Sequence, residues 1–178
     1  MPRGRLAAIV LLFLAALLLS CGVARAEPAR SGVKSGAAHP RIKHLREVER
    51  QILRYTNEAR RKNSLPLVDW DEGLMSVARA HSDDMLRRNF FSHENFGPRV
   101  APVIAGTASR AGENIFGGSG QDYADARLIA RNIVDGWMTS PSHRLNILKQ
   151  DYTHMGAGVS VLGKEIRATQ VFLARRPK

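Results

Sequence analysis

Two histidines and one glutamate stand in this sequence where a fold by itself has little need of them. His93 follows the aromatic pair Phe90-Phe91, Glu113 stands between a glycine and an asparagine, and His143 follows a Ser-Pro-Ser string. Two imidazoles and one carboxylate form a donor set that holds Zn²⁺ or a similar ion with one coordination position open. The same groups suit acid–base chemistry, with one as the base and another to orient it. A lone histidine is more often a structural residue, so the hypothesis of a site requires that all three meet.

The sequence lacks the standard signatures of common catalytic sites. His93-Glu94 is not followed by a second histidine in helical register, and Gly118-Ser119-Gly120 lacks the spacing of a nucleophile elbow. The single cysteine, Cys21, lies in the N-terminal apolar segment, which disfavours a cysteine nucleophile. Two functions therefore stay open. We favour a non-catalytic binding module over a hydrolase in which Glu113 or a histidine is the base for a bound water.

The N-terminus predicts export. Residues 1–26 begin with arginines, continue through the uncharged apolar run Leu6–Leu19 and end in Ala24-Arg25-Ala26, as secretory signal peptides do. The apolar run is shorter than a transmembrane helix, which takes about 20 residues. The string Leu18-Leu19-Ser20-Cys21 also resembles a bacterial lipobox, in which Cys21 would be lipidated. Processing therefore stays open between free secretion and a lipid anchor at Cys21.

Positive charge is concentrated near the N-terminus. The formal net charge is +11, but residues 27–62 carry ten Lys and Arg against four Asp and Glu, whereas residues 63–178 carry fourteen against twelve. A nucleic-acid-binding protein more often spreads its basic face over the fold. We therefore expect no nucleic-acid partner, and membrane contact only through lipidation or the basic arm. Residues 27–41 are expected to form a flexible basic linker, and Arg60-Arg61-Lys62 a solvated helix end.

The elements that position the three groups follow from the periodicity of the apolar residues. Helical spacing predicts helices over 42–62, from a cap at Asp69 or Asp71 to about 88, and over 123–138, and the start signal Ser140-Pro141 predicts a short helix over 142–148. Alternating β-branched residues predict a closing hairpin of 155–162 and 165–173. Residues 90–120, broken by Gly and Pro, are predicted to be mostly loop. The predicted fold class is α+β, with helices packed on a small sheet in one domain over 42–176.

An ordered set of short motifs resembles the CAP superfamily (SCP/TAPS), which comprises cysteine-rich secretory, antigen 5 and pathogenesis-related-1 proteins. The resemblance is to the cysteine-poor bacterial branch and covers most of residues 48–173. The motifs stand in the family's order: Asn57-x-x-Arg60, Leu67-x-x-Trp70, Leu74-x-x-x-Ala78-x-x-His81-x-x-x-Met85, Phe91-x-His93, Gly112-Glu113-Asn114-Ile115, Trp137-x-x-Ser140-x-x-His143-x-x-Asn146-Ile147-Leu148, Gly156-x-Gly158-Val159 and Thr169-Gln170-Val171-Phe172.

This resemblance implies a three-layer α-β-α sandwich with a small, mainly antiparallel sheet and a central cleft. In the family the cleft carries two histidines and two acidic residues, and His93, Glu113 and His143 fall on three of these positions. The fourth position falls on Ser140. A hydroxyl in place of an anionic ligand should weaken divalent-ion binding, and Ser140 is expected to cap the helix that follows it.

Three further residues are expected near this cleft. His81 lies on the apolar stripe of the second helix, as a core or cleft-wall residue. Asn114 is expected to tie loops together through hydrogen bonds, as is Asn146. Gln170, in the last strand, is expected to face the cleft.

The resemblance also bears on function. The family is known for lipid and sterol binding, so we expect a secreted or envelope-anchored module that binds a lipid-like or envelope ligand, or a divalent cation such as Zn²⁺. No cofactor is required for this function. An extracellular hydrolase of peptide, phospholipid or cell-wall material is the alternative. The sequence leaves the oligomeric state open.

Overall fold

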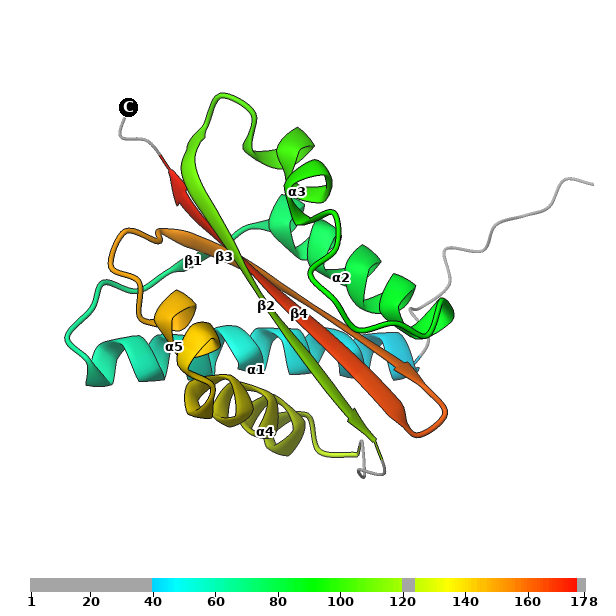
Figure 1. Ribbon diagram of the computed structural model, residues 1–178. Helices are drawn as coiled ribbons and strands as arrows, with labels where there is room; N and C mark the ends of the chain where they lie inside the picture. The colour runs from blue at the N-terminus through cyan, green and yellow to red at the C-terminus, as the bar shows by residue number, and fades with distance from the viewer. Residues whose placement is uncertain (1–39, 120–123, 176–178) are drawn as a thin grey trace, which may run out of the picture. The chain divides into compact units, whose positions relative to one another are not determined.

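The computed structural model describes residues 40–119 and 124–175, except for the side chains of 40–43 and 109. The predicted signal peptide, Cys21 and the linker up to residue 39 lie outside the described residues. The described chain forms five helices and four strands (Figure 1): α1 Pro40–Lys62, β1 Asp69–Trp70, α2 Glu72–Arg87, α3 Phe96–Ile104, β2 Ala108–Ser119, α4 Ala126–Thr139, α5 Pro141–Ile147, β3 His154–Leu162 and β4 Glu165–Arg175. In these ranges no helix is both long and apolar enough to cross a bilayer.

The strands form one sheet in the order β1-β3-β4-β2. β3 and β4 are the predicted closing hairpin, with Gly163 in its turn at a φ of 58°, where a residue without a side chain is favoured. β2 runs antiparallel to β4, and the two-residue β1 pairs with β3 in parallel. β2 and β1 are therefore the two edges of a mainly antiparallel sheet.

Helices cover both faces of this sheet (Figure 1). Along β4, Phe172 and Ala174 belong to the core cluster made with α1, α4 and α5, whereas Val171 and Leu173 belong to the cluster made with α2 and α3. This alternation follows from the two-residue period of a strand, which sends successive side chains to opposite faces. The predicted three-layer α-β-α sandwich is confirmed.

Two glycines of β3 let α2 lie directly on the sheet. A Cβ atom at Gly156 would lie 2.1 Å from the backbone nitrogen of Met75, and one at Gly158 would lie 2.1 Å from that of Arg79. Real Cβ atoms do not come this close to backbone, so a larger residue here would push α2 away. The Gly156-x-Gly158 string therefore sets the position of α2, and with it the start of the segment that carries His93.

Arg60 corrects the prediction of a solvated helix end. Its side chain is fully buried, and its guanidinium donates hydrogen bonds to the carbonyl oxygens of Pro66, Ile147, Lys149 and Tyr152 at 2.8–3.1 Å. Ile147 is the last residue of α5 and Lys149 lies just after it, where helix geometry leaves the last carbonyl groups without an internal partner. Arg60 therefore fastens α1 to the end of α5, the helix that carries His143.

The prediction of loop over 90–120 is wrong for most of that segment. α3 occupies Phe96–Ile104 and β2 occupies Ala108–Ser119. Gly97 and Pro102 weaken the helical pattern of α3. In β2, three glycines and five polar residues interrupt the apolar alternation that would mark a strand, and eleven register pairs with β4 supply the order instead.

Candidate functional site

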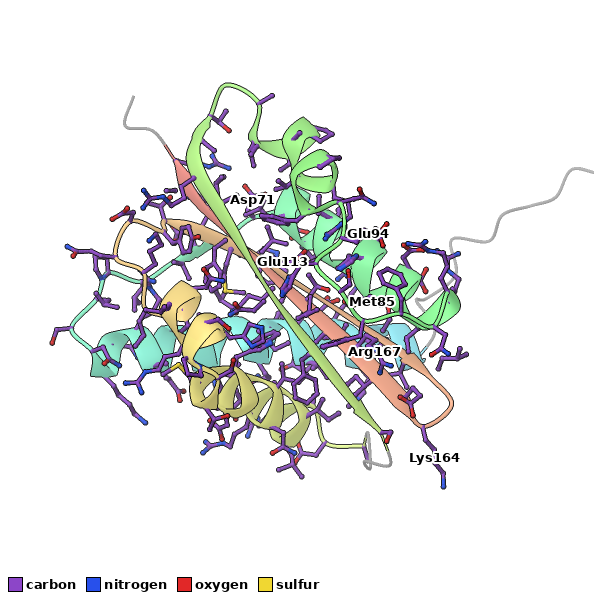
Figure 2. The ribbon with its side chains drawn as sticks, viewed as in Figure 1. Asp71, Met85, Glu94, Glu113, Lys164 and Arg167 are labelled. Carbon is purple, nitrogen blue, oxygen red and sulfur yellow. The ribbon has the colours of Figure 1, made fainter. Side chains whose placement is uncertain are left out.

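Glu113 lies in the middle of β2, opposite Val171 of β4 (Figure 2), and its side chain is only 2% exposed. A buried carboxylate is costly unless it is paired and hydrogen-bonded. Arg99 of α3 provides that pairing through two parallel bonds, from Nη1 to Oε2 at 2.8 Å and from Nη2 to Oε1 at 3.1 Å. This two-point guanidinium–carboxylate contact fixes the position of the carboxylate as well as compensating its charge.

His93 contacts the same carboxylate from the segment between α2 and α3. Its Nδ1 lies 3.0 Å from Glu113 Oε1. A carboxylate accepts hydrogen bonds and does not donate them, so we assign the proton of the neutral ring to Nδ1. The lone pair of His93 then lies on Nε2. Glu113 orients this ring. Because the side chain of His93 is half exposed, the ring is still accessible.

His143 faces His93 from the opposite helical layer. It lies in the first turn of α5, and the two ring centroids are 6.2 Å apart with an interplanar angle of 56°. Burial lowers the pKa of His143, and repulsion from His93 lowers it further. Near neutral pH His143 therefore presents an uncharged imidazole to its neighbour.

A layer of amide side chains holds this arrangement from behind. Asn146 of α5 donates from Nδ2 to the carbonyl oxygen of Glu113 at 3.1 Å and to Asn114 Oδ1 at 2.9 Å. Asn114 in turn donates to the carbonyl oxygen of His143 and to Gln170 Oε1, both at 3.1 Å. Gln170 completes the chain by donating to Thr56 of α1 at 2.8 Å. These bonds join β2, β4, α1 and α5, and the predicted tying role of the two asparagines is seen in them.

Asn114 and Gln170 are themselves fully buried, so they lie behind the exposed part of the site and not on its surface. Gly112 makes room for this layer. A Cβ atom there would lie 2.2 Å from Tyr152 Oη and 3.0 Å from Asn146 Oδ1.

His81 supports the segment that carries His93. It is 2% exposed, its Nε2 lies 3.0 Å from the carbonyl oxygen of Ser92, and its ring meets the edge of Phe90 at 5.9 Å between centroids. In the described part of the chain its buried Nδ1 has no hydrogen-bond partner, so the ring is neutral with its proton on Nε2. Burial accordingly lowers the pKa of His81. His81 is a buried residue that contacts Ser92, the residue immediately before His93.

Ser140 occupies the N-cap position of α5, with Pro141 as the first helical residue. Its hydroxyl makes no capping bond to a backbone amide and instead lies 3.5 Å from the hydroxyl of Ser142. The expectation that this side chain caps α5 is therefore wrong, although the position is right.

Sequence reasoning missed Arg99. The residue lies in the segment that was expected to be loop, and an arginine there reads as surface charge. One signal could have pointed to it: a buried carboxylate requires a cation nearby, and Arg99 lies fourteen residues before Glu113 in the same segment.

The three groups meet the needs of a metal ion only in part. Among residues 40–119 and 124–175, no three His, Cys, Asp or Glu side chains are grouped as metal ligands. Both oxygens of Glu113 already accept hydrogen bonds, and the neighbouring guanidinium opposes a second cation at that carboxylate. Glu113 therefore does not fit the role of a ligand in this arrangement, whereas the two imidazoles are free to donate lone pairs. Divalent-cation binding stays a prediction, and it depends on His93 and His143.

Comparisons with known proteins agree with this architecture. The family model "CAP: Cysteine-rich secretory protein family" matches residues 53–172, a range that contains every residue of the site. The uncharacterized membrane protein YlbC of Bacillus subtilis (strain 168) is 38% identical over 115 residues, which are 62% of this chain and 31% of YlbC. The chain thus spans about a third of that relative's length.

Two solved structures share the fold. An extracellular protein containing an SCP domain, from Bacillus anthracis str. Ames, has a TM-score of 0.59 at 34% identity, over 78% of this chain and 45% of that chain. NaASP2, solved with Zn²⁺, has a TM-score of 0.56 over 71% of this chain and 78% of its own, but at 14% identity the likeness is one of fold alone. With the family model matching well over half of the sequence and the sandwich seen in the structure, this chain belongs to the CAP family.

Proposed function

We propose that this CAP-domain protein is an exported binding module whose ligand is held by the facing imidazoles of His93 and His143. The observation that carries the proposal is the arrangement of the two rings. They come from opposite helical layers, lie 6.2 Å apart between centroids, and one of them is fixed by the buried Glu113–Arg99 pair. Export is supported by the predicted signal peptide, and by relatives that are named as an extracellular protein and a membrane protein.

Two imidazoles with accessible ring nitrogens suit a borderline metal ion, or a ligand that donates hydrogen bonds. Two rings that share a Zn²⁺ ion at 2.0–2.1 Å from each nitrogen have centroids roughly 5–6 Å apart. Ser140 stands where the family has an acid, and Glu113 is engaged by Arg99. A metal ion held by the two imidazoles must therefore take its remaining donor atoms from molecules other than these two residues.

Calorimetric titration of the purified protein with Zn²⁺ tests the proposal. We expect saturable binding that is weakened in His93→Ala and in His143→Ala and abolished in the double variant. His154→Ala is the matched control, because that histidine lies at the start of β3, two strands away from β2. Binding that survives in the double variant would refute the role of the histidine pair.

A hydrolase is the second candidate, and the His93–Glu113 contact is the observation that favours it. A carboxylate on Nδ1 leaves Nε2 as a base that is already oriented, which is the geometry needed to activate a water molecule. No serine is hydrogen-bonded to His93 Nε2 among the described residues, so water would be the nucleophile. We rank the hydrolase second because a histidine that only binds a ligand requires the same oriented and accessible nitrogen.

Glu113→Gln separates the two candidates. In a hydrolase this change removes the carboxylate that orients the base, and turnover of peptide, phospholipid or cell-wall substrates should fall by at least about 100-fold. Equal turnover by the wild type and the variant on all three substrate classes would exclude catalysis at this site.

A further inference from the structure

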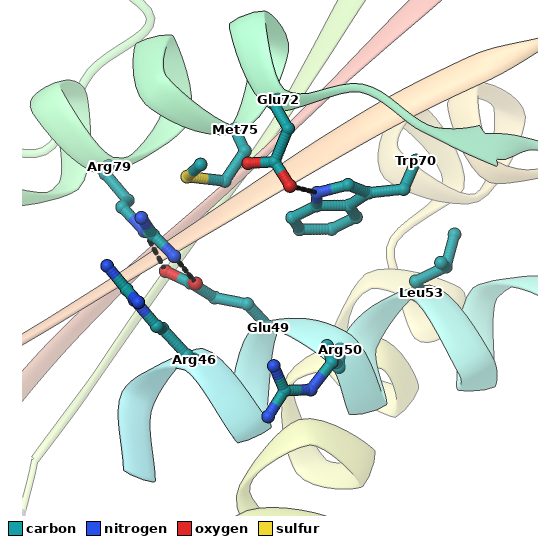
Figure 3. A pocket seen from close by; sticks show the side chains of 8 residues that line it. All are labelled: Arg46, Glu49, Arg50, Leu53, Trp70, Glu72, Met75 and Arg79. Atoms are coloured by element: carbon teal, nitrogen blue, oxygen red, sulfur yellow. Dashed lines mark hydrogen bonds and ion pairs between the residues drawn. The ribbon is translucent and has the colours of Figure 1, made fainter. Parts of the chain in front are cut away.

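A hollow lies at the edge of the sheet opposite to the histidine site. It has a volume of about 490 Å³, and it lies between α1 and α2 beside Trp70 of β1 (Figure 3). Pockets that bind small molecules span about 300–1,000 Å³ and combine apolar walls with a few placed polar groups. Leu53, Trp70 and Met75 give this hollow its apolar side, and charged residues of both helices give it its ends.

The two acidic groups of the hollow are already engaged. Glu49, whose side chain is 2% exposed, accepts hydrogen bonds from the Arg79 guanidinium, at 2.8 Å for Nε, and from the backbone N–H of Val159 at 3.2 Å. At the other end, Glu72 Oε1 accepts from the indole Nε1 of Trp70 at 3.0 Å. The first contact holds the Arg79 guanidinium in place, and the second fixes the plane of the indole.

Positive charge exceeds negative charge at the Glu49 end. Arg50 is bonded to Glu47, which does not line the hollow. Arg46 has no acidic partner in the described ranges, and Figure 3 shows its guanidinium beside the Arg79–Glu49 pair. Two guanidinium groups therefore line this end of the hollow against one carboxylate, and that carboxylate is paired with Arg79. An oxyanion placed between them would gain charge-assisted hydrogen bonds from planar donors that match a carboxylate.

We propose that this hollow, which we call the α1–α2 hollow, binds a small carboxylate with a flat apolar body. The carboxylate lies between Arg46 and Arg79, and the body lies against Trp70, Leu53 and Met75. The orientation follows from the charges, because Glu72 would repel an anion at the Trp70 end. The fixed indole plane favours a flat body, since aromatic groups pack best in offset-stacked or edge-to-face contacts. This site is independent of the histidine pair.

The probe is naphthalene-2-carboxylate, titrated into the full-length ¹⁵N-labelled protein. The two tryptophan indole N–H signals distinguish binding in the hollow from a general change of the fold within one spectrum. Trp70 lines the hollow, whereas Trp137 is 1% exposed and donates to the carbonyl oxygen of Ile115 at 2.9 Å. We expect a saturable shift of the Trp70 signal with no shift of the Trp137 signal. The uncharged naphthalene-2-carboxamide should bind at least about tenfold more weakly, because it lacks the charge that Arg46 and Arg79 recognise.

Arg46→Gln tests the charge without leaving a carboxylate unpaired. We expect about tenfold weaker binding of the carboxylate by this variant and unchanged binding by Arg61→Gln, an exposed position on the same helix. An unmoved Trp137 signal in each variant reports that the fold is intact. The proposal is overturned if the Trp70 signal does not shift, if the acid and the amide bind equally, or if Arg46→Gln binds like the wild type.

Discussion

Removing the Arg99 guanidinium tests whether the histidine site is built on a compensated buried charge. Glu113 is 2% exposed on its side chain, and both of its oxygens accept from Arg99, at 2.8 and 3.1 Å. Arg99→Met keeps an unbranched apolar stem of similar reach. It leaves the carboxylate with His93 as its remaining side-chain partner.

The expected cost follows from this geometry. Removing one partner of a buried ion pair costs about 3–5 kcal/mol, because the other charge stays buried. Arg99 is 20% exposed and His93 stays 3.0 Å from the carboxylate, so part of the compensation survives. We expect about 2–3 kcal/mol of lost unfolding free energy. In a Glu113→Gln background no charge is left to compensate, and the same change should cost about 1 kcal/mol or less.

Urea unfolding of the four proteins of this double-mutant cycle measures the coupling. Arg110→Met is the control, since the pair that Arg110 forms with Asp151 is 52% and 58% exposed and should contribute at most about 1 kcal/mol. The reasoning fails if Arg99→Met costs the same in both backgrounds, or no more than Arg110→Met does.

Three further predictions follow from the packing. Burial lowers the pKa of His81, so below the ordinary histidine pKa of 6.5 the unfolded chain binds a proton that the folded chain excludes. The free energy of unfolding should therefore fall as the pH drops below 6.5. In urea titrations, His81→Gln should lose less unfolding free energy than the wild type between about pH 7.5 and pH 5. Gly158→Ala should cost about 1–3 kcal/mol because it displaces α2, whereas Gly97→Ala, with open space around it, should be neutral or stabilising; equal melting temperatures would contradict this. Arg60→Met should lose about 3 kcal/mol or more, with amide exchange of α5 showing whether the helix end is released.

The fold was largely predictable from local pattern. α1, α2 and α4 each carry an apolar stripe, α5 begins at the Ser140-Pro141 start signal, and the closing hairpin shows alternation around Gly163, so their positions follow from residues close together in sequence. β2 and α3 did not show such patterns. Residues in β2 serve the contacts of the site and not an apolar pattern. Glu113 pairs with Arg99, Asn114 donates to Gln170, and Gly112 leaves room for Tyr152. Such a strand can be identified from its pairing with β4 but not from the periodicity of its own sequence.

The sequence by itself determined the candidate groups, namely His93, Glu113 and His143, and the layers that would hold them. Only the tertiary structure decided how those groups are placed and paired. The pairing of β2 with β4 turns Glu113 toward the α3 face, where Arg99 occupies its oxygens, and α5 brings His143 over the same edge of the sheet. The physical reason is range: residue type and spacing act over a few neighbours, whereas the partner of a buried charge is set by strand register and helix packing across the whole domain.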